Sequence, residues 1–248
     1  MLFRSHRTDQ RRQAHIVPVN IQASSKPQIR REYAQAILKA ALDLHRHPQN
    51  HTVDQTSTGQ PSDKRVSFGL VRMANIDPLI DVAMALHDMP MPEGVHIHLC
   101  VYHSRHSLLV RSGLEHTIDQ ALQRHGQDKD PMSQLHKPAI RAAMDAHPEA
   151  DHLFVVLATA VAEVGRDHDY DWAVVEPSSM RSIIQLAGRV RRHRPDEYLV
   201  PNLLLLDTNV RHLSNGAGKP VFLRPGFEHL SSTGFQLRTH HLKELLTP

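Results

Sequence analysis

Short apolar runs alternate with longer amphipathic stretches from residue 65 to about residue 207. The runs predict buried strands at residues 65–71, 95–102, 152–159, 171–176 and 202–207. Strands that are apolar along nearly their whole length are typical of a parallel sheet covered by helices on both faces. The alternation of strand and helix therefore predicts the α/β fold class.

The amphipathic stretches predict the helices that connect these strands, at residues 77–87, 106–125, 137–147 and 178–187. Asp77 and Pro78 are typical of a helix start, because aspartate caps the free backbone N–H groups and proline fits the first turn. Ser178 or Ser179 is expected to cap the last of these helices. Gly188 is expected to end it.

The two ends of the chain differ from this central part. Residues 1–64 hold ten lysines and arginines against five acids, and combine one predicted helix, 29–46, with a polar, turn-rich stretch that we interpret as a flexible linker. Proline and glycine after Asn209 predict an irregular carboxy-terminal extension. The predicted domains are a helical lead-in and linker (1–64), the α/β domain (65–210) and the extension (211–248).

Composition narrows the class of protein. The 248 residues are 40% hydrophobic, with 29 lysines and arginines against 26 acids, so an anionic partner is allowed but not required. The single cysteine, Cys100, lies in an apolar run and can form no internal disulfide, which fits a reducing compartment. No run of about 18 apolar residues and no secretory signal is present, so we expect a soluble, cytoplasmic protein without a membrane partner.

The 21 histidines suggest a metal site, but the spacing of candidate ligands does not support one. Structural zinc sites usually include thiolates, and the chain has no cysteine pair; His96 and His98 simply alternate on a predicted strand. The acidic run 167–171 fails as a calcium loop, because Trp172 and Ser178 occupy positions that need glycine and glutamate. We therefore expect no metal ligands in this chain.

Two stretches resemble nucleotide-binding motifs without matching them. GAGKP at 216–220 would need glycine at position 213 and a hydroxyl residue at position 220, where the chain has Leu213 and Pro220. DEYL at 196–199 follows no apolar strand and ends in leucine. We find no complete nucleoside triphosphate site in this sequence.

Polar segments are expected at one edge of the predicted sheet. In doubly wound sheets, ligands bind outside the carboxyl ends of the strands. YHSRH (102–106) follows the second strand, TAVAEVGRDHD (159–169) follows the third, and GRVRRHR (188–194) comes after the helix that follows the fourth. We expect all three segments to converge there.

These segments carry a family resemblance. The elements Y-H-S-R, A-T-x-V-x-E-x-G-x-D and Q-x-x-G-R-x-x-R, in this order, resemble motifs IV, V and VI of the second RecA-like domain of a superfamily 2 helicase. The string VLATAVAEVGRDHDYDWAVVEPSSMRSIIQLAGRVRRHR resembles more specifically the CRISPR-associated helicase-nuclease of type I-F systems, over about residues 65–229. The resemblance implies a RecA-like sheet, and a longer protein with a nuclease domain, a first RecA-like lobe and a fused adaptation subunit.

The resemblance implies nucleotide roles for motif VI. Arg189 and Arg192 match the arginine fingers that approach the γ-phosphate of ATP, and Gln185 matches the residue that senses the nucleotide. Arginine suits this role because its guanidinium stays charged and donates two parallel hydrogen bonds. Gly188 is expected to let the backbone turn so that both fingers project.

Motifs V and IV receive roles in the same way. Gly165 and Asp167 match positions near the nucleotide ribose, and a turn-capping role is the alternative for Asp167. Thr159, Ser104 and Arg105 match contacts to the backbone of single-stranded DNA. An ordinary helix N-terminus is the alternative for Ser104 and Arg105.

Arg191 and Arg194 match no assigned position, and we expect them to be solvated or phosphate-screening surface charges. The resemblance implies that the chain acts as the second lobe of an ATP-dependent single-stranded DNA translocase in CRISPR interference. The implied cofactors are ATP and Mg²⁺, with the Mg²⁺ held by residues outside this chain. The implied partners are a first lobe, a nuclease domain and the CRISPR surveillance complex. Without a phosphate loop, acidic box or nuclease residues, this chain alone is expected to be inactive. The alternatives are a non-enzymatic split module that binds single-stranded DNA or a partner lobe, and another superfamily 2 helicase.

Overall fold

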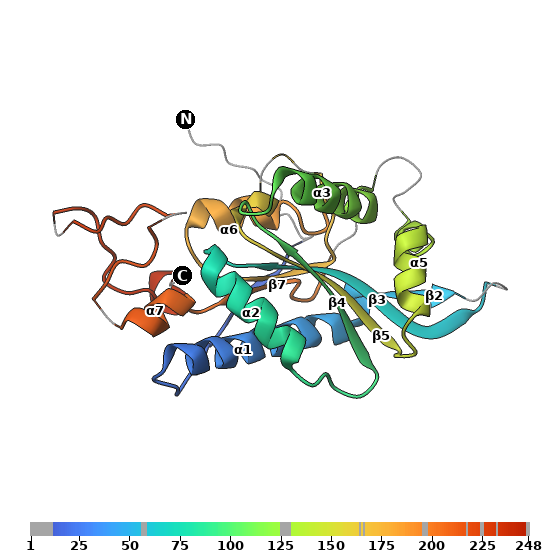
Figure 1. Cartoon of the computed structure of the whole chain (residues 1–248), viewed down its shortest axis with the longest axis horizontal. Helices are drawn as coiled ribbons and strands as arrows, with labels where there is room; N and C mark the ends of the chain where they lie inside the picture. The colour runs from blue at the N-terminus through green and yellow to red at the C-terminus, as the bar shows by residue number, and fades with distance from the viewer. Residues whose placement is uncertain are drawn as a thin grey trace.

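A single mixed sheet forms the centre of the molecule (Figure 1). The computed structural model describes residues 12–55, 59–124, 130–163, 165, 167–194, 198–216, 218–223, 226–231 and 233–246. Within them, seven strands pair in the order β1-β7-β6-β3-β5-β4, with β2 on β3. Their bounds are Ala14–Val17 (β1), Thr52–Gln55 (β2), Pro61–Arg72 (β3), Val95–Tyr102 (β4), Asp151–Ala158 (β5), Trp172–Val175 (β6) and Leu203–Leu206 (β7). Every pairing except β2 with β3 is parallel, which confirms the predicted α/β class.

Helices cover both faces of the sheet. One face carries α1 (Lys26–Arg46), α2 (Ile76–Asp88) and α7 (Val210–Asn215). The other carries α3 (Leu108–Leu122), α4 (Pro131–Leu135), α5 (Pro138–Asp145), α6 (Met180–Ala187) and α8 (Leu242–Leu245). Figure 1 shows α1 and α2 below the sheet, and α3 and α6 above it. The strands are therefore buried between two apolar cores, as their continuous apolar sequences predict.

The segment before residue 65 packs onto this sheet. In α1, Ile29, Tyr33, Ile37 and Leu44 follow one another at spacings of four or seven residues and are all buried. The strand β1 extends the sheet beside β7, and the stretch interpreted as a linker contains β2 and the first residues of β3. Residues 56–58 of that stretch lie outside the described residues. The boundary at residue 65 stays a prediction about domain organisation.

A glycine in the middle of β3 makes room for the only tryptophan. Gly69 pairs with Trp172 of β6, and a β-carbon at position 69 would lie 2.1 Å from the indole ring. The indole Nε1 donates to the Ser67 hydroxyl over 3.0 Å, and the same oxygen lies 2.7 Å from His45 Nδ1 of α1. Close approach of a neighbouring group explains a glycine inside a strand.

Several element ends differ from the prediction. The N-cap position of α2 is Asn75 rather than Asp77, whereas Ser179 caps α6 and accepts a hydrogen bond from the Ser182 N–H (3.2 Å). The carboxy-terminal extension contains α7 and α8, which are too short for a sequence pattern to predict. Glu228 organises the rest of the extension, because its carboxylate accepts three backbone N–H groups and contacts His240 at 2.9 Å.

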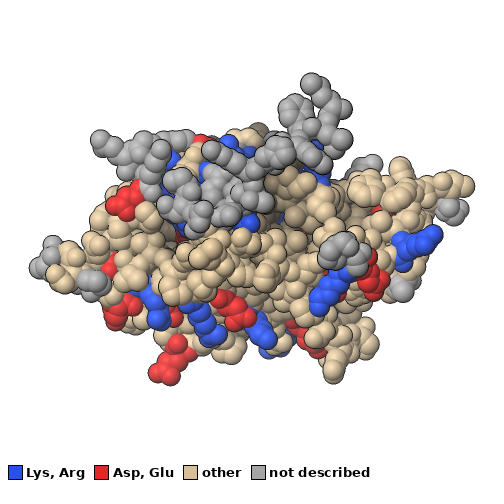
Figure 2. All heavy atoms as spheres, turned by 180° about the vertical axis from the view of Figure 1, so that it is seen from behind, with Lys and Arg blue, Asp and Glu red and all other residues tan. Residues whose placement is uncertain are grey.

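Among the helices of the described residues, none has the length and apolar character needed to cross a membrane. In Figure 2, basic and acidic side chains are interspersed along the lower border of the face in view. That border presents no continuous surface of one charge.

Candidate nucleotide and nucleic-acid site

Motif IV and the start of motif V lie together at the carboxyl edge of the sheet. Ser104 and Arg105 follow β4 and are exposed, and Thr159 follows β5 and is 7% exposed. The Thr159 N–H donates to the Tyr102 carbonyl over 3.3 Å, which joins the two segments. Arg105 forms an ion pair with Asp77 of α2. The three predicted DNA-contacting residues are thus neighbours, as expected for parallel strands that end at one edge.

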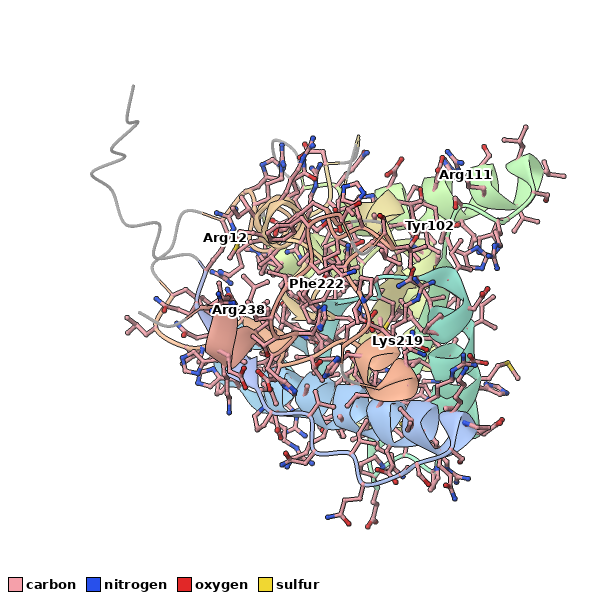
Figure 3. All side chains as sticks on the ribbon, turned by 90° about the vertical axis from the view of Figure 1, so that its left-hand side faces the viewer. Arg12, Tyr102, Arg111, Lys219, Phe222 and Arg238 are labelled. Atoms are coloured by element: carbon pink, nitrogen blue, oxygen red, sulfur yellow. The ribbon has the colours of Figure 1, made fainter. Side chains whose placement is uncertain are left out.

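The N-cap position of α3 is taken by Ser107, so Ser104 stands before the helix rather than capping it. Behind Tyr102, Glu115 of α3 accepts from the tyrosine hydroxyl at 2.7 Å and from Arg111 Nε at 2.9 Å. Tyr102 and Arg111 are labelled in Figure 3. These bonds fix the end of β4 against α3, and with it the start of motif IV.

A buried charged group lies beneath this edge. Arg72 at the end of β3 donates from Nε to Glu163 over 2.7 Å and from Nη1 to the Glu176 carbonyl over 3.1 Å. The Glu176 carboxylate accepts the N–H groups of Ala74 and Val210, while burial raises its pKa. Neither Arg72 nor Glu176 is among the site residues predicted from the sequence. The sequence feature that could have indicated them is a charged residue at the end of an apolar run, where burial is expected.

Motifs V and VI meet through ion pairs and one backbone contact. Arg189 Nη2 donates to the Glu163 carbonyl over 2.9 Å. Arg192 Nε lies 2.5 Å from Asp167 Oδ1, and His193 Nε2 lies 2.8 Å from the same oxygen. Burial, then the charge of Arg192, lower the pKa of Arg189. The structure therefore brings both predicted fingers and the motif V aspartate into one cluster. His193, which also contacts Asp167, is not among the site residues predicted from the sequence.

Two glycines of this cluster have different backbone requirements. Gly165 has a φ of 73°, in the left-handed region that favours glycine. Gly188 has a right-handed φ of −63°, so the expectation that it supplies a special turn is wrong. A β-carbon there would lie 3.2 Å from the carbonyl of Gln185, in the last turn of α6. The left-handed residue of motif VI is Arg191, with a φ of 48°.

The expected convergence of three segments at the carboxyl edge is wrong for motif VI. Tyr170, which precedes β6, donates its N–H to the Arg189 carbonyl and accepts from the Arg191 N–H, each over 2.9 Å. Motif VI therefore lies beside the start of β6. The reason is length: eight helical residues span about 12 Å, so α6 returns the chain along a four-residue strand of similar length. The Arg189 side chain reaches back to motif V.

Arg191 and Arg194 are buried, each 7% exposed, so the expectation of surface charges is wrong. Arg194 donates from Nη1 to Asp171 over 2.7 Å and from Nη2 to Asp169 over 2.9 Å. The Arg191 guanidinium lies 4.3 Å from the centre of the Tyr198 ring, a cation–π contact. These two arginines hold motif VI to the body of the lobe.

The acidic run 167–171 supplies the counter-charges for the arginine segment. Asp167 pairs with Arg192, whereas Asp169 and Asp171 pair with Arg194. Burial, then the charge of Arg194, lower the pKa of the neighbouring Arg124 to about 10. The run that fails as a calcium loop is therefore an ion-pairing segment. In the sequence, alternating acids followed by clustered arginines are the pattern that could have predicted these ion pairs.

The amino-terminal lead-in also contacts motif VI. Arg12, labelled in Figure 3, donates from Nε to the Val190 carbonyl over 3.0 Å. Residue 190 lies between the two predicted fingers. The lead-in therefore fixes the backbone that carries them.

Comparison with known families identifies this arrangement. The family model for the CRISPR-associated nuclease/helicase Cas3, C-terminal, matches residues 65–195, more than half of the chain. The chain belongs to this Cas3 family. The matched range begins within β3 and includes motifs IV, V and VI, so the resemblance predicted from these motifs is confirmed.

Two curated relatives carry the description CRISPR-associated nuclease/helicase Cas3 subtype I-F/YPEST. The protein of Pseudomonas aeruginosa is 50% identical over 96% of this chain, and that of Pectobacterium atrosepticum is 47% identical over 94%. The chain spans about a fifth of the length of each, 21% and 20%. A crystal structure of T. fusca Cas3-ATP matches with a TM-score of 0.50 and 17% identity, covering 86% of this chain and 19% of that chain. This likeness shows the fold, a RecA-like sheet flanked by helices.

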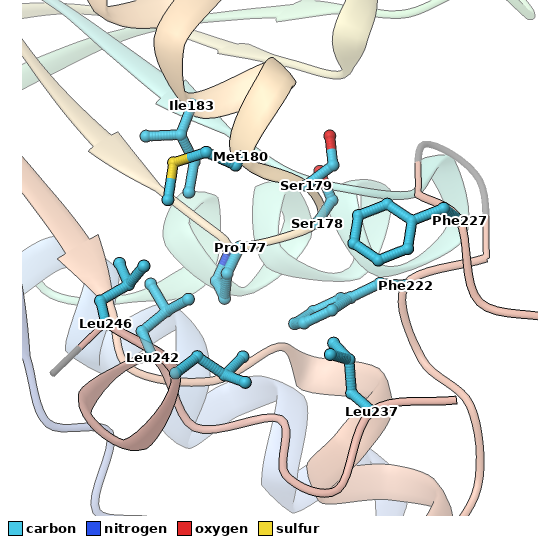
Figure 4. Close-up of a pocket in the computed structure, with 11 residues that line it drawn as sticks. Pro177, Ser178, Ser179, Met180, Ile183, Phe222, Phe227, Leu237, Leu242 and Leu246 are labelled. Atoms are coloured by element: carbon cyan, nitrogen blue, oxygen red, sulfur yellow. The ribbon is translucent and has the colours of Figure 1, made fainter. Parts of the chain in front are cut away.

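The Cas3-like lobe also has an apolar pocket between α6 and the carboxy-terminal extension (Figure 4). Met180 and Ile183 of α6 face Phe222, Leu237 and Leu242 across it. Among the described residues, its lining is apolar apart from Ser178 and Ser179. The pocket lies apart from the cluster of Arg189, Arg192 and Asp167, none of which lines it.

Proposed function

We propose that this chain is the second RecA-like lobe of an ATP-dependent single-stranded DNA translocase that acts in CRISPR interference. The observation that carries the proposal is the cluster of Arg189, Arg192 and Asp167, which joins motif VI to motif V by direct contacts. Membership of the Cas3 family supports it, and relatives of that description are nuclease/helicases.

The cluster has the charge expected of a phosphate site. Arg189 and Arg192 interact unfavourably, which contributes to the lowered pKa of Arg189, and a bound phosphate would relieve this repulsion. ATP would supply the γ-phosphoryl group whose hydrolysis drives movement. Arg189 and Arg192 would donate to its oxygens as charge develops there, Gln185 would respond to the nucleotide from α6, and Gly165 and Asp167 would border the ribose.

We propose that Mg²⁺ is held by a first lobe. The carboxylate of Asp167 already contacts Arg192 and His193 at 2.5 and 2.8 Å, which leaves its charge compensated. Residues of the first lobe and the nuclease domain of the longer relatives, and the CRISPR surveillance complex, are the proposed partners.

Single-stranded DNA is proposed to follow the carboxyl edge, at Ser104 and Arg105. The Arg105 side chain is 61% exposed and its pair with Asp77 is a surface pair, so exchange of the carboxylate for a DNA phosphate costs little. Thr159, at 7% exposed, would form the floor of this site. Contacts of this kind weaken with salt and carry no sequence information.

The decisive experiment measures ATP hydrolysis by this chain combined with a first RecA-like lobe. Arg189→Ala and Arg192→Ala are expected to reduce the rate by about 10³- to 10⁵-fold, since an arginine finger has that effect in other phosphoryl-transfer proteins. Arg46→Ala is the matched control, because Arg46 is an exposed arginine of α1 with a weak surface pair. Equal rates in the finger variants and the control would refute the proposed roles.

The isolated chain separates this proposal from the split-module alternative. We expect it to hydrolyse no ATP, and hydrolysis that is abolished by Arg189→Ala would contradict that expectation. A module that only binds DNA would show salt-sensitive binding that falls with Arg105→Ala. Such a module would show no loss of ATPase activity with Arg189→Ala when a first lobe is added.

A further inference from the structure

A cluster of histidines lies at the β4 edge of the sheet. His96 and His98 come from β4, His147 and Glu149 from the loop between α5 and β5, and His152 from β5. The rings of His96 and His147 stack at a centroid distance of 3.4 Å. The parallel register, which sets His96 opposite His152, brings together residues about 50 positions apart in the sequence.

Three of these residues converge on one point. His96 Nδ1 lies 4.0 Å from Glu149 Oε1, and His147 Nδ1 lies 4.0 Å from Glu149 Oε2. One donor atom from each of the three residues lies within 4.8 Å of the other two. Glu149 Oε2 is buried and has no hydrogen-bond partner among the described residues. Buried polar atoms are in most cases compensated by a hydrogen bond, a water molecule or an ion.

We propose that His96, His147 and Glu149 form a binding site for a divalent transition-metal ion of the zinc class. Imidazole nitrogen and carboxylate oxygen are zinc ligands, at about 2.0 to 2.2 Å. Tetrahedral geometry at those lengths separates two ligand atoms by about 3.4 Å, so the three donor atoms, which lie within 4.8 Å of one another, would close by at most about 1.4 Å. Three protein ligands leave a fourth position for water or for a group from a partner.

The surrounding groups are compatible with a cation. Lys64 lies beside the cluster, with Nζ 3.4 Å from His152 Nε2, and it donates to the carbonyls of Met144 (2.6 Å) and His147 (2.9 Å), which hold it in place. His98 Nε2 and His152 Nδ1 lie 3.0 Å apart and hydrogen-bond to each other. These two histidines form an outer layer beside the three ligands rather than part of the ligand set.

A metal ion bound at this site would cross-link two segments of the lobe. β4 ends the strand order of the sheet, and an edge strand has hydrogen-bonding partners on one side only. A metal ion would tie β4 to the loop that enters β5 and so stabilise the folded lobe. This role is independent of the proposed motor function, because the site lies on β4 and the α5–β5 loop. It shares no residue with the cluster of Arg189, Arg192 and Asp167.

The test measures Zn²⁺ binding to the untagged 248-residue chain, stripped with a chelator, by competition with a chromophoric chelator. One equivalent is expected to bind, and His96→Ala and Glu149→Gln are each expected to lower the affinity by more than about tenfold, since even outer partners of metal ligands have effects of 10- to 100-fold. His116→Ala is the matched control, because His116 is an exposed histidine of α3. Zn²⁺ should also raise the Tm of the unsubstituted chain but not of Glu149→Gln.

Fluorescence of the buried Trp172 shows whether each variant is folded before metal is added. Binding by the unsubstituted chain that is no tighter than binding by Glu149→Gln would overturn the site. A loss with His98→Ala equal to that with His96→Ala would overturn the assignment of the ligands. Equal ATPase rates of Arg189→Ala and the unsubstituted chain in the presence of a first lobe, with intact zinc binding, would contradict the motor proposal alone.

Discussion

Replacing Arg194 tests whether motif VI is held by a buried ion-pair network. Its guanidinium makes four hydrogen bonds, two to Asp169, one to Asp171 and one to the Tyr170 carbonyl. Burial opposes the charge, but the two aspartates outweigh that effect and raise the pKa of Arg194. Arg194→Ala would leave both carboxylates buried with Arg124 as the neighbouring cation, at 3.5 to 3.8 Å.

Removing one partner of a buried pair destabilises a protein by about 3 to 5 kcal/mol. Arg192→Ala is the comparison, because Arg192 lies two residues away in the same motif and its pair with Asp167 is partly exposed, 40% and 31%. An exposed pair contributes about 0 to 1 kcal/mol. The two substitutions should therefore differ by at least about 2 kcal/mol in the free energy of unfolding.

Urea unfolding followed by the fluorescence of Trp172 measures this difference, because the chain has one tryptophan and it is fully buried in β6. With an m-value of about 3 kcal/mol/M, Arg194→Ala should lower the midpoint by about 1 to 1.7 M. Arg194→Lys keeps the charge but loses the planar fork, so it should fall between Arg194→Ala and the unsubstituted chain. Equal midpoints for Arg194→Ala and Arg192→Ala would refute the assignment of a structural role to Arg194.

Two further predictions concern the core. Gly69→Ala places a β-carbon 2.1 Å from the Trp172 ring, so it should destabilise the chain by about 1 to 3 kcal/mol or more and change the near-ultraviolet circular dichroism; an unchanged spectrum and midpoint would contradict the packing. Burial lowers the pKa of His45 to about 4, so the folded chain binds fewer protons there than the unfolded chain, and stability should rise with pH between about 4 and 6.5. The full rise attributable to this histidine is about 3 kcal/mol. Urea midpoints at pH 5 and pH 7 should show a smaller rise in His45→Gln, and an equal rise would show that His45 is not the group responsible.

The sequence by itself determined the central sheet and its motifs. Each predicted strand from residue 65 onward is present, because continuous apolar runs have no other stable place than between two layers of helices. The order of motifs IV, V and VI predicted the family, which the family model confirms. Both results depend on patterns that are local in the chain.

The tertiary structure decided two features that neither the apolar runs nor the motif order predicts: the two short strands and the burial of individual arginines. β1 and β2 are four residues long. They become strands only because β7 offers a free edge and because β6 pairs with β3 only from Gly69 onward, which leaves the first part of β3 open to β2. The local sequence likewise does not determine which arginines are buried. Four arginines in six residues look alike in the sequence, yet Arg191 and Arg194 are buried and Arg192 is exposed.

The physical reason is that burial of a charge depends on the partner that compensates it. Asp169 and Asp171 reach Arg194 because a short helix returns the chain to the start of β6, a matter of matched lengths rather than of residue type. The histidine cluster shows the same dependence, since sheet register brings His96 to the loop that carries Glu149. Sequence spacing determined which elements form, and the packing of those elements determined which charges meet.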